Sequence, residues 1–475
     1  MSEPRYRRVL FLLLDGARPD VLQALLDAGE LPRIRTLLVP DGRVRTAVAC
    51  FPTVSGAAHL PFMTGCFPGT LGAPGIYWFD RSLQAAGGSP LRSVRSYLTP
   101  FRNASLDRDL APGTPTLAAA WPDARYVFGW YTRGSPPEAL LTRHTKITSF
   151  LTGLLTRDWM CCDRHAEAAL VRAVDLGGSF VFSVFPATDE LGHRFGPTAP
   201  QTLAAYRGMD GVVGRLFDRL ARRGEAESTL VVLSSDHGMS PTHTHFPLDH
   251  AVEAAFGKTL TFKRWPTPLS GFKAVVLASG NGMANVYFRG DGWARGRPDA
   301  SLFAGFARGL LAGNAVDHVA WRTANGDLRV EGHGGAATMH EVPGGVVYRP
   351  EGVDPFGYDP LPEGMDTGTA LRRTIDTDYP DAPFGLLTWA RSHRAGDLLV
   401  TARLGTDLRN WFEYQEPRGS HGGLHAAHAR VPILCNAPLA DGPMRTADLY
   451  PTMVELAGRI LPPGVEGVSR AAGNP

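Results

Sequence analysis

Three hydrophobic runs in this chain are each followed closely by an aspartate. The pairs are Val9–Leu14 before Asp15, Phe180–Phe185 before Asp189, and Leu230–Leu233 before Asp236. Uninterrupted apolar runs of this length are typical of strands that are buried on both faces, as in a parallel sheet. Ligands of open α/β sheets bind at the carboxyl ends of the strands. The sequence therefore predicts that the three carboxylates meet at one edge of a buried sheet.

Two histidines accompany these aspartates. His237 directly follows Asp236, and His193 follows Asp189 by four residues, a spacing that brings both side chains to one side of a helical turn. Carboxylates and imidazoles are common ligands of divalent metal ions. Taken singly, Asp15 could instead cap a helix, and the segment from Asp189 to His193 could be a salt-bridged surface turn. The three motifs together favour a metallohydrolase.

Amphipathic helices are predicted after the first two runs. Pro19 and Asp20 are start signals for the first helix. After His193, apolar residues recur at alternating spacings of three and four, at Tyr206, Met209, Val213, Leu216 and Leu220. A strand at residues 431–435 and a helix at 449–456 are predicted near the C-terminus. Recurring strand, ligand-bearing turn and helix predict an α/β fold, with a doubly wound, mostly parallel sheet sandwiched by helices.

The middle of the chain differs from the rest in composition and in hydrophobic pattern. From residue 251 to residue 385, glycine and proline are frequent, and the apolar runs are short and alternating. We expect this region to be an inserted cap that covers the active face and contributes to substrate choice. Residues 1–250 and 386–475 would then form the two parts of the catalytic core.

Charge, hydrophobic run length and cysteine spacing limit the partners and sites that the chain could have. The net charge of the 475-residue chain is only +2, so nothing indicates binding to a nucleic-acid polymer. The run Val9–Leu14 is too short for a membrane-spanning helix or a signal peptide, which favours a cytoplasmic protein without membrane association. The five cysteines have no Cys-x-x-Cys spacing, so we expect reduced thiols rather than disulfides or a thiolate metal site. The sequence does not indicate an oligomeric state.

Two further segments carry candidate catalytic residues. Thr53 lies in a turn that contains proline and glycine, where it is either a helix N-cap or a nucleophile activated by a metal ion. His421 lies among glycines in Gly419–Gly423, on a loop that is free to reach a metal ion. His425 and His428 follow closely, so the pattern alone leaves open which of the three histidines is a ligand.

In the order of these motifs the chain resembles the type I phosphodiesterase/nucleotide pyrophosphatase family of the alkaline phosphatase superfamily. The matching segments are Leu14–Asp20, Phe51–Thr53, Thr64–Pro68, Asp189–Pro197, Ser235–Met239, Gly419–Gly422, Arg445–Thr452 and Val465–Gly467. The resemblance extends over nearly the whole chain apart from the cap. It implies a two-metal phosphohydrolase that cleaves phosphodiester or pyrophosphate bonds in a small-molecule phosphate ester.

The resemblance also implies a role for each motif. One metal ion would be bound by Asp189, His193 and His421, and the other by Asp15, Asp236, His237 and the Thr53 oxygen. The mixed carboxylate and imidazole ligands suit zinc, with manganese as the alternative. Thr53 would attack phosphorus and form a covalent phosphothreonine, which water would then hydrolyse.

One departure from the family pattern concerns the substrate. Family members that cleave nucleotides usually carry a phosphoryl-binding asparagine in the loop after the nucleophile, and residues 69–76 contain none. The amide of Val54 is an alternative donor to the phosphoryl group. Tyr77 and Trp78 are candidates for stacking on an aromatic part of the substrate, although burial in the core is an equal alternative for both.

Other functions are associated with this fold. A sulfatase is disfavoured, because Thr53 does not lie in the Cys/Ser-x-Pro-x-Arg motif that sulfatases need. A phosphomonoesterase or a phosphonate hydrolase would use the same metal ions and threonine. A non-catalytic binding protein is a weaker alternative, since all the expected ligand and nucleophile positions are filled.

Overall fold

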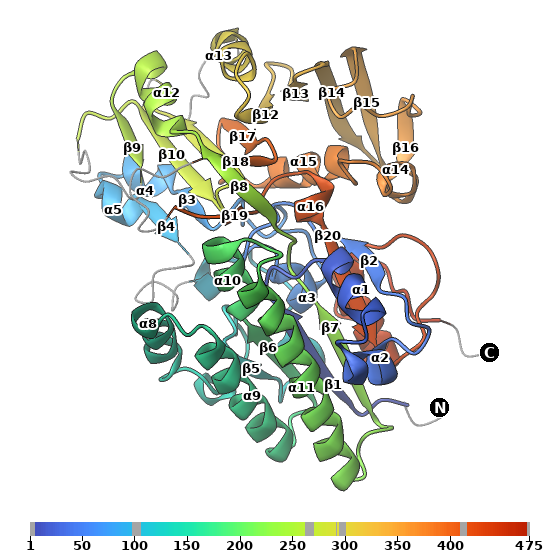
Figure 1. The fold of residues 1–475 in the computed structure, drawn as a ribbon. Helices are drawn as coiled ribbons and strands as arrows, with labels where there is room; N and C mark the ends of the chain where they lie inside the picture. Colours follow the sequence, from blue (N-terminus) through green and yellow to red (C-terminus); the bar gives the residue numbers. More distant parts are fainter. Residues whose placement is uncertain are drawn as a thin grey trace.

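Two large sheets organise the chain. The computed structural model describes residues 5–96, 106–261, 270–290, 292–293, 301–408 and 416–472. Within these residues, one unit contains the first strand of the chain and is the core, and the second unit is the cap, which lies above the core in Figure 1.

The core sheet has six strands in the order β2-β20-β7-β1-β6-β5. They are β1 (Arg8–Leu14), β2 (Arg45–Val48), β5 (Arg125–Val127), β6 (Phe180–Phe185), β7 (Thr229–Ser234) and β20 (Arg430–Cys435). The strands β7, β1, β6 and β5 are parallel, whereas β20 is antiparallel to both β7 and β2. The three predicted runs are adjacent strands, and β6 and β7 are buried throughout. The prediction of strands buried on both faces is confirmed, within a mixed sheet.

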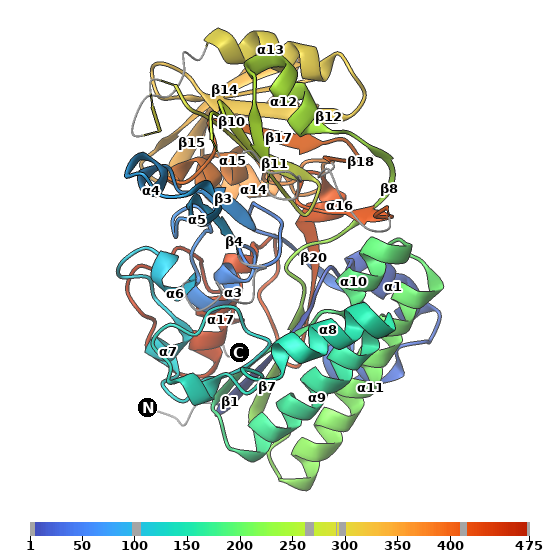
Figure 2. The ribbon, with the colours of Figure 1, turned by 90° about the vertical axis from the view of Figure 1, so that its left-hand side faces the viewer.

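Helices lie on both sides of the core sheet (Figure 2). One side carries α1 (Pro19–Asp27), α2 (Pro32–Leu38), α8 (Lys146–Thr156), α9 (Met160–Asp175), α10 (Ala187–Phe195) and α11 (Pro200–Arg222), and the other carries α3 (Leu60–Thr64), α7 (Leu117–Ala120) and α17 (Leu449–Leu456). The helix predicted after His193 is α11, and the five residues predicted for its apolar face are buried. This arrangement confirms the predicted α/β sandwich.

The cap is built around a nine-stranded sheet in the order β16-β15-β14-β13-β12-β17-β11-β10-β9. Its strands are β9 (Thr259–Thr261), β10 (Ala274–Ser279), β11 (Met283–Phe288), β12 (Val316–Arg322), β13 (Leu328–Gly332), β14 (Gly335–Val342), β15 (Gly345–Gly352), β16 (Gly364–Asp366) and β17 (Leu398–Ala402). The strand β17 pairs with β11 and β12 in the middle of the sheet. The cap sheet therefore extends past residue 385, where we expected the cap to end.

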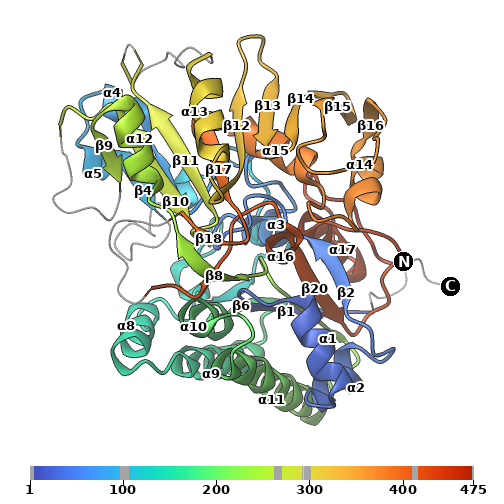
Figure 3. The ribbon, with the colours of Figure 1, turned by 45° about the horizontal axis from the view of Figure 1, so that its top comes forward.

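Four helices flank the cap sheet. In Figure 3, α12 (Leu248–Phe256) and α13 (Ser301–Leu311) lie in front of the strands, on the outer face. Figure 2 shows α14 (Thr367–Thr374) and α15 (Ala382–Arg391) on the face toward the core. One hydrophobic cluster is continuous from the core sheet into this inner face, and a second lies under α12 and α13. The cap is therefore packed on the core.

Two small sheets lie near the boundary between the units. The strand β8 (Ser240–His245) lies between β18 (Gly405–Asp407) and β19 (Gly419–Ser420), and β3 (Tyr77–Phe79) pairs with β4 (Val94–Ser96). The remaining helices are α4 (Arg81–Ala85), α5 (Pro90–Ser93), α6 (Leu106–Asp109), η2 (Pro137–Ala139), α16 (Ala426–Ala429) and η3 (Thr446–Asp448). Within the described ranges, no helix combines the length and the apolar character that crossing a bilayer would require.

Candidate active site

The parallel strands β1, β6 and β7 end level with one another. Leu14 is in register with Phe185 of β6, and Leu13 is in register with Ser234 of β7. Because the carboxyl ends of parallel strands meet at the same edge of a sheet, the turns that follow them are neighbours. The three predicted carboxylates are delivered to this edge, beneath the cap.

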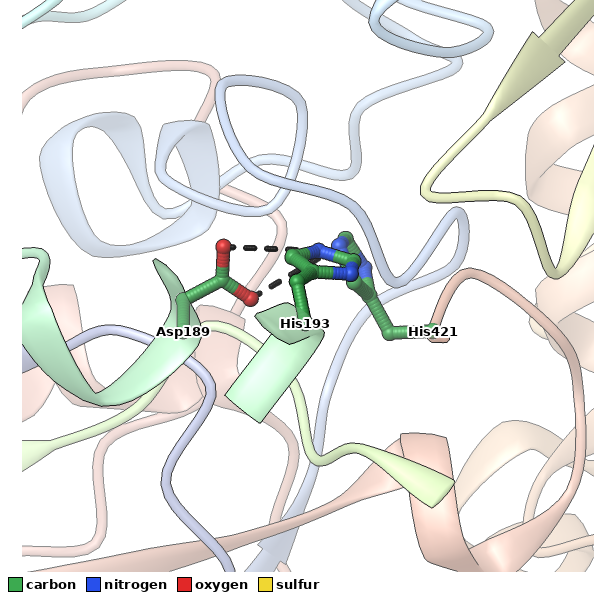
Figure 4. Close-up of side chains that lie close together, drawn as sticks. All are labelled: Asp189, His193 and His421. Atoms are coloured by element: carbon green, nitrogen blue, oxygen red, sulfur yellow. Dashed lines mark ion pairs between the residues drawn. The ribbon is translucent and has the colours of Figure 1, made fainter. Parts of the chain in front are cut away.

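The first group of candidate ligands consists of Asp189, His193 and His421 (Figure 4). One ligand atom from each residue lies within 4.8 Å of the others. Nε2 of His193 is 3.5 Å from one carboxylate oxygen of Asp189, and Nε2 of His421 is 3.8 Å from the other. Helix α10 carries the first two residues one turn apart, and His421 directly follows β19.

The second group consists of Asp15, Asp236 and His237, whose ligand atoms also lie within 4.8 Å of one another. Nε2 of His237 is 3.5 Å from Oδ1 of Asp15 and 3.4 Å from Oδ2 of Asp236. The rings of His237 and His421 are stacked, with 3.6 Å between their centroids. The two groups are therefore adjacent and form one centre.

The turn that follows β1 approaches α10 closely, and this close approach depends on a glycine. Gly16 has a φ of +71°, and a Cβ at this position would lie 3.0 Å from Oδ1 of Asp189. A side chain at residue 16 would therefore be strained and would press on a candidate ligand.

All three candidate histidines present Nε2 to the centre. Nδ1 of each ring donates to a backbone carbonyl: His193 to Gly419 at 2.8 Å, His237 to Gly238 at 3.1 Å, and His421 to Thr53 at 3.0 Å. In a neutral ring, a proton on Nδ1 leaves the lone pair on Nε2, which is the tautomer that binds a metal ion through Nε2. The backbone thus fixes both the orientation and the tautomer of each ring.

The carboxylates of the centre are crowded. Burial, together with the neighbouring Asp236 and Asp189, raises the pKa of Asp15 well above its usual value. Burial acts to raise the pKa of Asp236, but the nearby His237 and His59 outweigh burial and hold this pKa below its usual range. One oxygen each of Asp189 and Asp236 accepts no hydrogen bond from the described residues. Carboxylate oxygens without a hydrogen bond, beside three Nε2 atoms that face the same centre, are a ligand set that fits divalent cations.

The structure separates two hydroxyl groups in the turn that was predicted to hold the nucleophile. The Thr53 hydroxyl donates to the carbonyl of Gly423 at 2.9 Å. The Ser55 hydroxyl instead lies 3.3 Å from Oδ1 of Asp15 and 3.1 Å from Nε2 of His237. The Ser55 hydroxyl, which the sequence reasoning missed, therefore lies against the second group, whereas the Thr53 hydroxyl is bonded to the backbone. The sequence feature that could have indicated Ser55 is its place as the second hydroxyl-bearing residue before Gly56.

His59 is another residue that the sequence reasoning missed. Its side chain is fully buried, and Nε2 lies 3.2 Å from Oδ2 of Asp236. The ring packs near Phe182 of β6, with 6.1 Å between the ring centroids. His59 therefore contacts a candidate ligand from the core. It follows Ser55 by four residues, and this spacing is the one signal that could have indicated it.

The residues predicted to bind substrate have other contacts. The amide of Val54 donates to the carbonyl of Pro52 at 2.9 Å, so it is not available to a phosphoryl group. Tyr77 and Trp78 are 6% and 0% exposed, within β3. The Arg394 guanidinium lies 5.5 Å from the centroid of the Trp78 ring. The structure thus places both aromatic residues in the packing between core and cap.

The three histidines of the C-terminal loop have different positions. His421 belongs to the first group. His428 is buried; its Nδ1 accepts from the amide of Gly423 at 3.0 Å, and its Nε2 lies 2.8 Å from the hydroxyl oxygen of Ser240. His425 accepts a hydrogen bond from a backbone amide at the start of α16. His428 therefore supports the loop that carries His421, and His425 caps a helix.

Comparison with known proteins finds one family model that matches more than half of the chain. The family model described as type I phosphodiesterase / nucleotide pyrophosphatase matches residues 9–299. An uncharacterized pyrophosphatase/phosphodiesterase of Schizosaccharomyces pombe is 31% identical over 286 residues, which are 56% of this chain and 51% of that protein. A GPI ethanolamine phosphate transferase 2 of Aspergillus oryzae is 35% identical over 98 residues, 21% of this chain and 11% of that protein. The match thus spans about half the length of the first relative and less of the second.

Solved structures with the same fold match nearly the whole chain. Phosphonoacetate hydrolase from Sinorhizobium meliloti 1021, in complex with phosphonoacetate, has a TM-score of 0.56 at 18% identity and is matched over 96% of both chains. Murine ectonucleotide pyrophosphatase / phosphodiesterase 5, in complex with AMP, has a TM-score of 0.53 at 15% identity over the same share of both chains. The shared fold therefore includes the cap.

Proposed function

Because the chain belongs to the type I phosphodiesterase/nucleotide pyrophosphatase family, we propose that it is a metal-dependent hydrolase of small-molecule phosphodiesters or pyrophosphates. The family match supports phosphoester hydrolysis, and the fold agrees with it. One observation carries the proposal: two adjacent ligand groups lie at the carboxyl edge of the core sheet, with the Ser55 hydroxyl against the second.

Two divalent cations fit the two groups. Asp189, His193 and His421 would hold one, and Asp15, Asp236 and His237 would hold the other. Ligand sets of imidazole nitrogen and carboxylate oxygen suit zinc, with manganese as the alternative. When bound, the cations would neutralise charge on the phosphoryl oxygens and favour the ionised form of the Ser55 hydroxyl.

Ser55 is the proposed nucleophile. Its oxygen would bond to phosphorus while the bond from phosphorus to the leaving oxygen breaks, which gives a phosphoserine. A water molecule would then attack the same phosphorus and release the Ser55 hydroxyl. The phosphothreonine expected from the sequence is replaced in this proposal, because the Thr53 hydroxyl is bonded to the Gly423 carbonyl.

A phosphonate hydrolase is the second candidate. It is favoured by the fold shared with phosphonoacetate hydrolase over 96% of the chain. The same ligand groups and hydroxyl would serve both reactions, but the bond broken is phosphorus–carbon in one and phosphorus–oxygen in the other.

The test combines a substrate panel with identification of the covalent intermediate. The panel is bis-para-nitrophenyl phosphate, para-nitrophenyl phosphate, phosphonoacetate and para-nitrophenyl sulfate, and we expect the diester to give the highest kcat/KM. Acid quenching during turnover and peptide mass spectrometry should locate phosphate on Ser55. A preference for the monoester or the phosphonate would overturn the diesterase assignment. Phosphate on Thr53 would overturn the assignment of the nucleophile.

A further inference from the structure

A cavity of about 910 Å³ lies beside the first ligand group. Glu190, which directly follows Asp189, forms part of its wall, and α8 contributes Lys146, Ile147 and Phe150. The rest of the lining comes from residues 107–108 and 129–143. The cavity therefore adjoins the proposed centre and has room for a group attached to the phosphoryl centre of a substrate.

Lys146 is a poorly paired cation in this cavity. Its Nζ lies 3.7 Å from the centroid of the Trp130 ring, a distance that suits a cation–π contact. Its hydrogen bonds to the carbonyls of Phe128 and Gly129 are long, at 3.4 and 3.5 Å. No ion pair joins it to a carboxylate of the described residues. Burial lowers the pKa of Lys146 to about 7, so an anion beside the ammonium would offset its desolvation.

The charges that line the cavity leave an excess of cations. The charged lining residues are Arg108, Arg133, Arg143 and Lys146 against Asp107 and Glu190. Asp107 accepts hydrogen bonds from the amide and the hydroxyl of Thr132, so its carboxylate is already engaged within the wall. The Arg133 guanidinium donates to the carbonyls of Leu110 and Ala111 and is held in place. An anionic ligand is therefore favoured over a cationic one.

Aromatic and aliphatic side chains form the rest of the surface. Trp130 and Phe150 are in the wall, together with Leu140 and Ile147. Rings of this kind favour a planar or apolar ligand body through stacking and burial of apolar area. An anion on an aromatic body would satisfy both kinds of contact at once.

We propose that this cavity binds one of the two groups esterified to phosphorus, and that it prefers an aromatic group carrying a second anion, with Lys146 as the partner of that anion. This inference rests on the proposed function, because the proposed function is what places the reacting phosphorus next to the cavity. This second anion is a carboxylate or a phosphate, and the experiment below distinguishes between the two.

The first experiment compares diesters that release the same reporter. Each carries one para-nitrophenyl ester, and the second ester group is phenyl, para-carboxyphenyl, para-phosphophenyl or para-trimethylammoniophenyl. We expect kcat/KM of one or both anionic diesters to exceed that of the phenyl diester by roughly tenfold, the effect of one charge-assisted hydrogen bond. The cationic diester should be the poorest. Equal kcat/KM for all four would overturn the inference and leave the diesterase assignment standing.

Variants of Lys146 give the matched control. Lys146→Met removes the charge but keeps a long apolar side chain, and should abolish the preference for anions, measured as the ratio of kcat/KM for the anionic diesters to kcat/KM for the phenyl diester. Lys146→Arg should restore part of the preference. Lys258→Met, at an exposed lysine of the cap, should retain all of it. A preference that survives Lys146→Met in protein with unchanged thermal unfolding would contradict the role of Lys146.

A binding measurement separates this inference from the proposed function. Calorimetric titration with terephthalate uses no turnover, so it remains decisive if no diester is hydrolysed. We expect the dissociation constant of terephthalate to rise roughly tenfold or more in Lys146→Met and to be unchanged in Lys258→Met. The same affinity in wild type and Lys146→Met would sink the anion subsite. Hydrolysis of none of the diesters would instead sink the proposed function.

Discussion

The hydroxyl oxygen of Ser55 lies 3.1 Å from Nε2 of His237. This hydroxyl therefore faces the atoms that would bind the second cation. Two residues earlier in the same turn, the Thr53 hydroxyl is engaged with the carbonyl of Gly423. The two hydroxyls have different surroundings, so their removal should have different consequences.

The first prediction concerns this pair of hydroxyls. Ser55→Ala should lower kcat on an aryl diester by at least roughly 10³-fold, because it removes the attacking atom. Thr53→Val keeps the shape of the side chain and removes its hydrogen bond, so it should cost about 1–3 kcal/mol of unfolding free energy and lower kcat far less. Steady-state kinetics and chemical denaturation of both variants provide the check. A larger loss of kcat in Thr53→Val than in Ser55→Ala would identify Thr53 as the nucleophile instead.

The second prediction concerns metal removal. Dialysis against EDTA should abolish activity, and zinc or manganese should restore it, with two ions per chain found by elemental analysis. Saturating metal at about 100 times its dissociation constant should add about 2.7 kcal/mol to the free energy of unfolding for each ion bound. Asp189→Asn and Asp236→Asn should each lower the metal content, whereas Asp175→Asn, at a surface ion pair with Arg219, should not. Full activity in metal-free protein would exclude the proposed centre.

The parts of the site that the sequence predicted are those with local patterns. Asp15, Asp189 and Asp236 follow buried apolar runs, and such runs in parallel strands place their following turns at one edge. His193 lies one helical turn from Asp189. These relations need no knowledge of contacts between distant segments.

The parts that the sequence did not predict depend on distant contacts. Thr53 and Ser55 are equivalent by composition, and the choice between them depends on the Gly423 carbonyl, 370 residues along the chain from Thr53. Tyr77 and Trp78 are buried because β3 lies against the cap, which a local pattern cannot show. The end of the cap was misplaced for the same reason, since β17 pairs with β11 and β12.

The third prediction ranks the histidines of the C-terminal loop. His421→Ala removes a candidate ligand and should cause the largest loss of kcat/KM and of bound metal. His428→Ala removes two hydrogen bonds that support the loop and should cost roughly 10–100-fold. His425→Ala removes a helix cap, so it should lower stability by about 1 kcal/mol and leave kcat/KM nearly unchanged. Kinetics and metal content of the three variants test this order, and a larger effect at His425 would contradict it.

A buried carboxyl group connects the helix that carries the first ligand group to its neighbour. Oδ1 of Asp163, on α9, accepts a hydrogen bond from the amide of Ala187 at the start of α10, at 3.0 Å. Burial raises the pKa of Asp163 from 3.8 to about 7. The protonated form is therefore favoured in the folded state. Its contribution to stability is fully present below the unfolded pKa and is lost as the pH rises toward the folded pKa.

The fourth prediction follows from this shift. Asp163→Asn keeps an acceptor for the Ala187 amide and cannot ionise. Between pH values of about 4 and about 7, the unfolding free energy of wild type should therefore fall relative to that of the variant, by at most about 1.4 kcal/mol per pH unit. The measurement is urea denaturation of both proteins across this range, in excess EDTA so that metal binding does not add a second pH dependence. Asp175→Asn, at an exposed ion pair, serves as the matched control and should show little of this slope. If the difference between wild type and Asp163→Asn is the same at every pH, Asp163 is ionised in the folded protein and its burial does not raise its pKa.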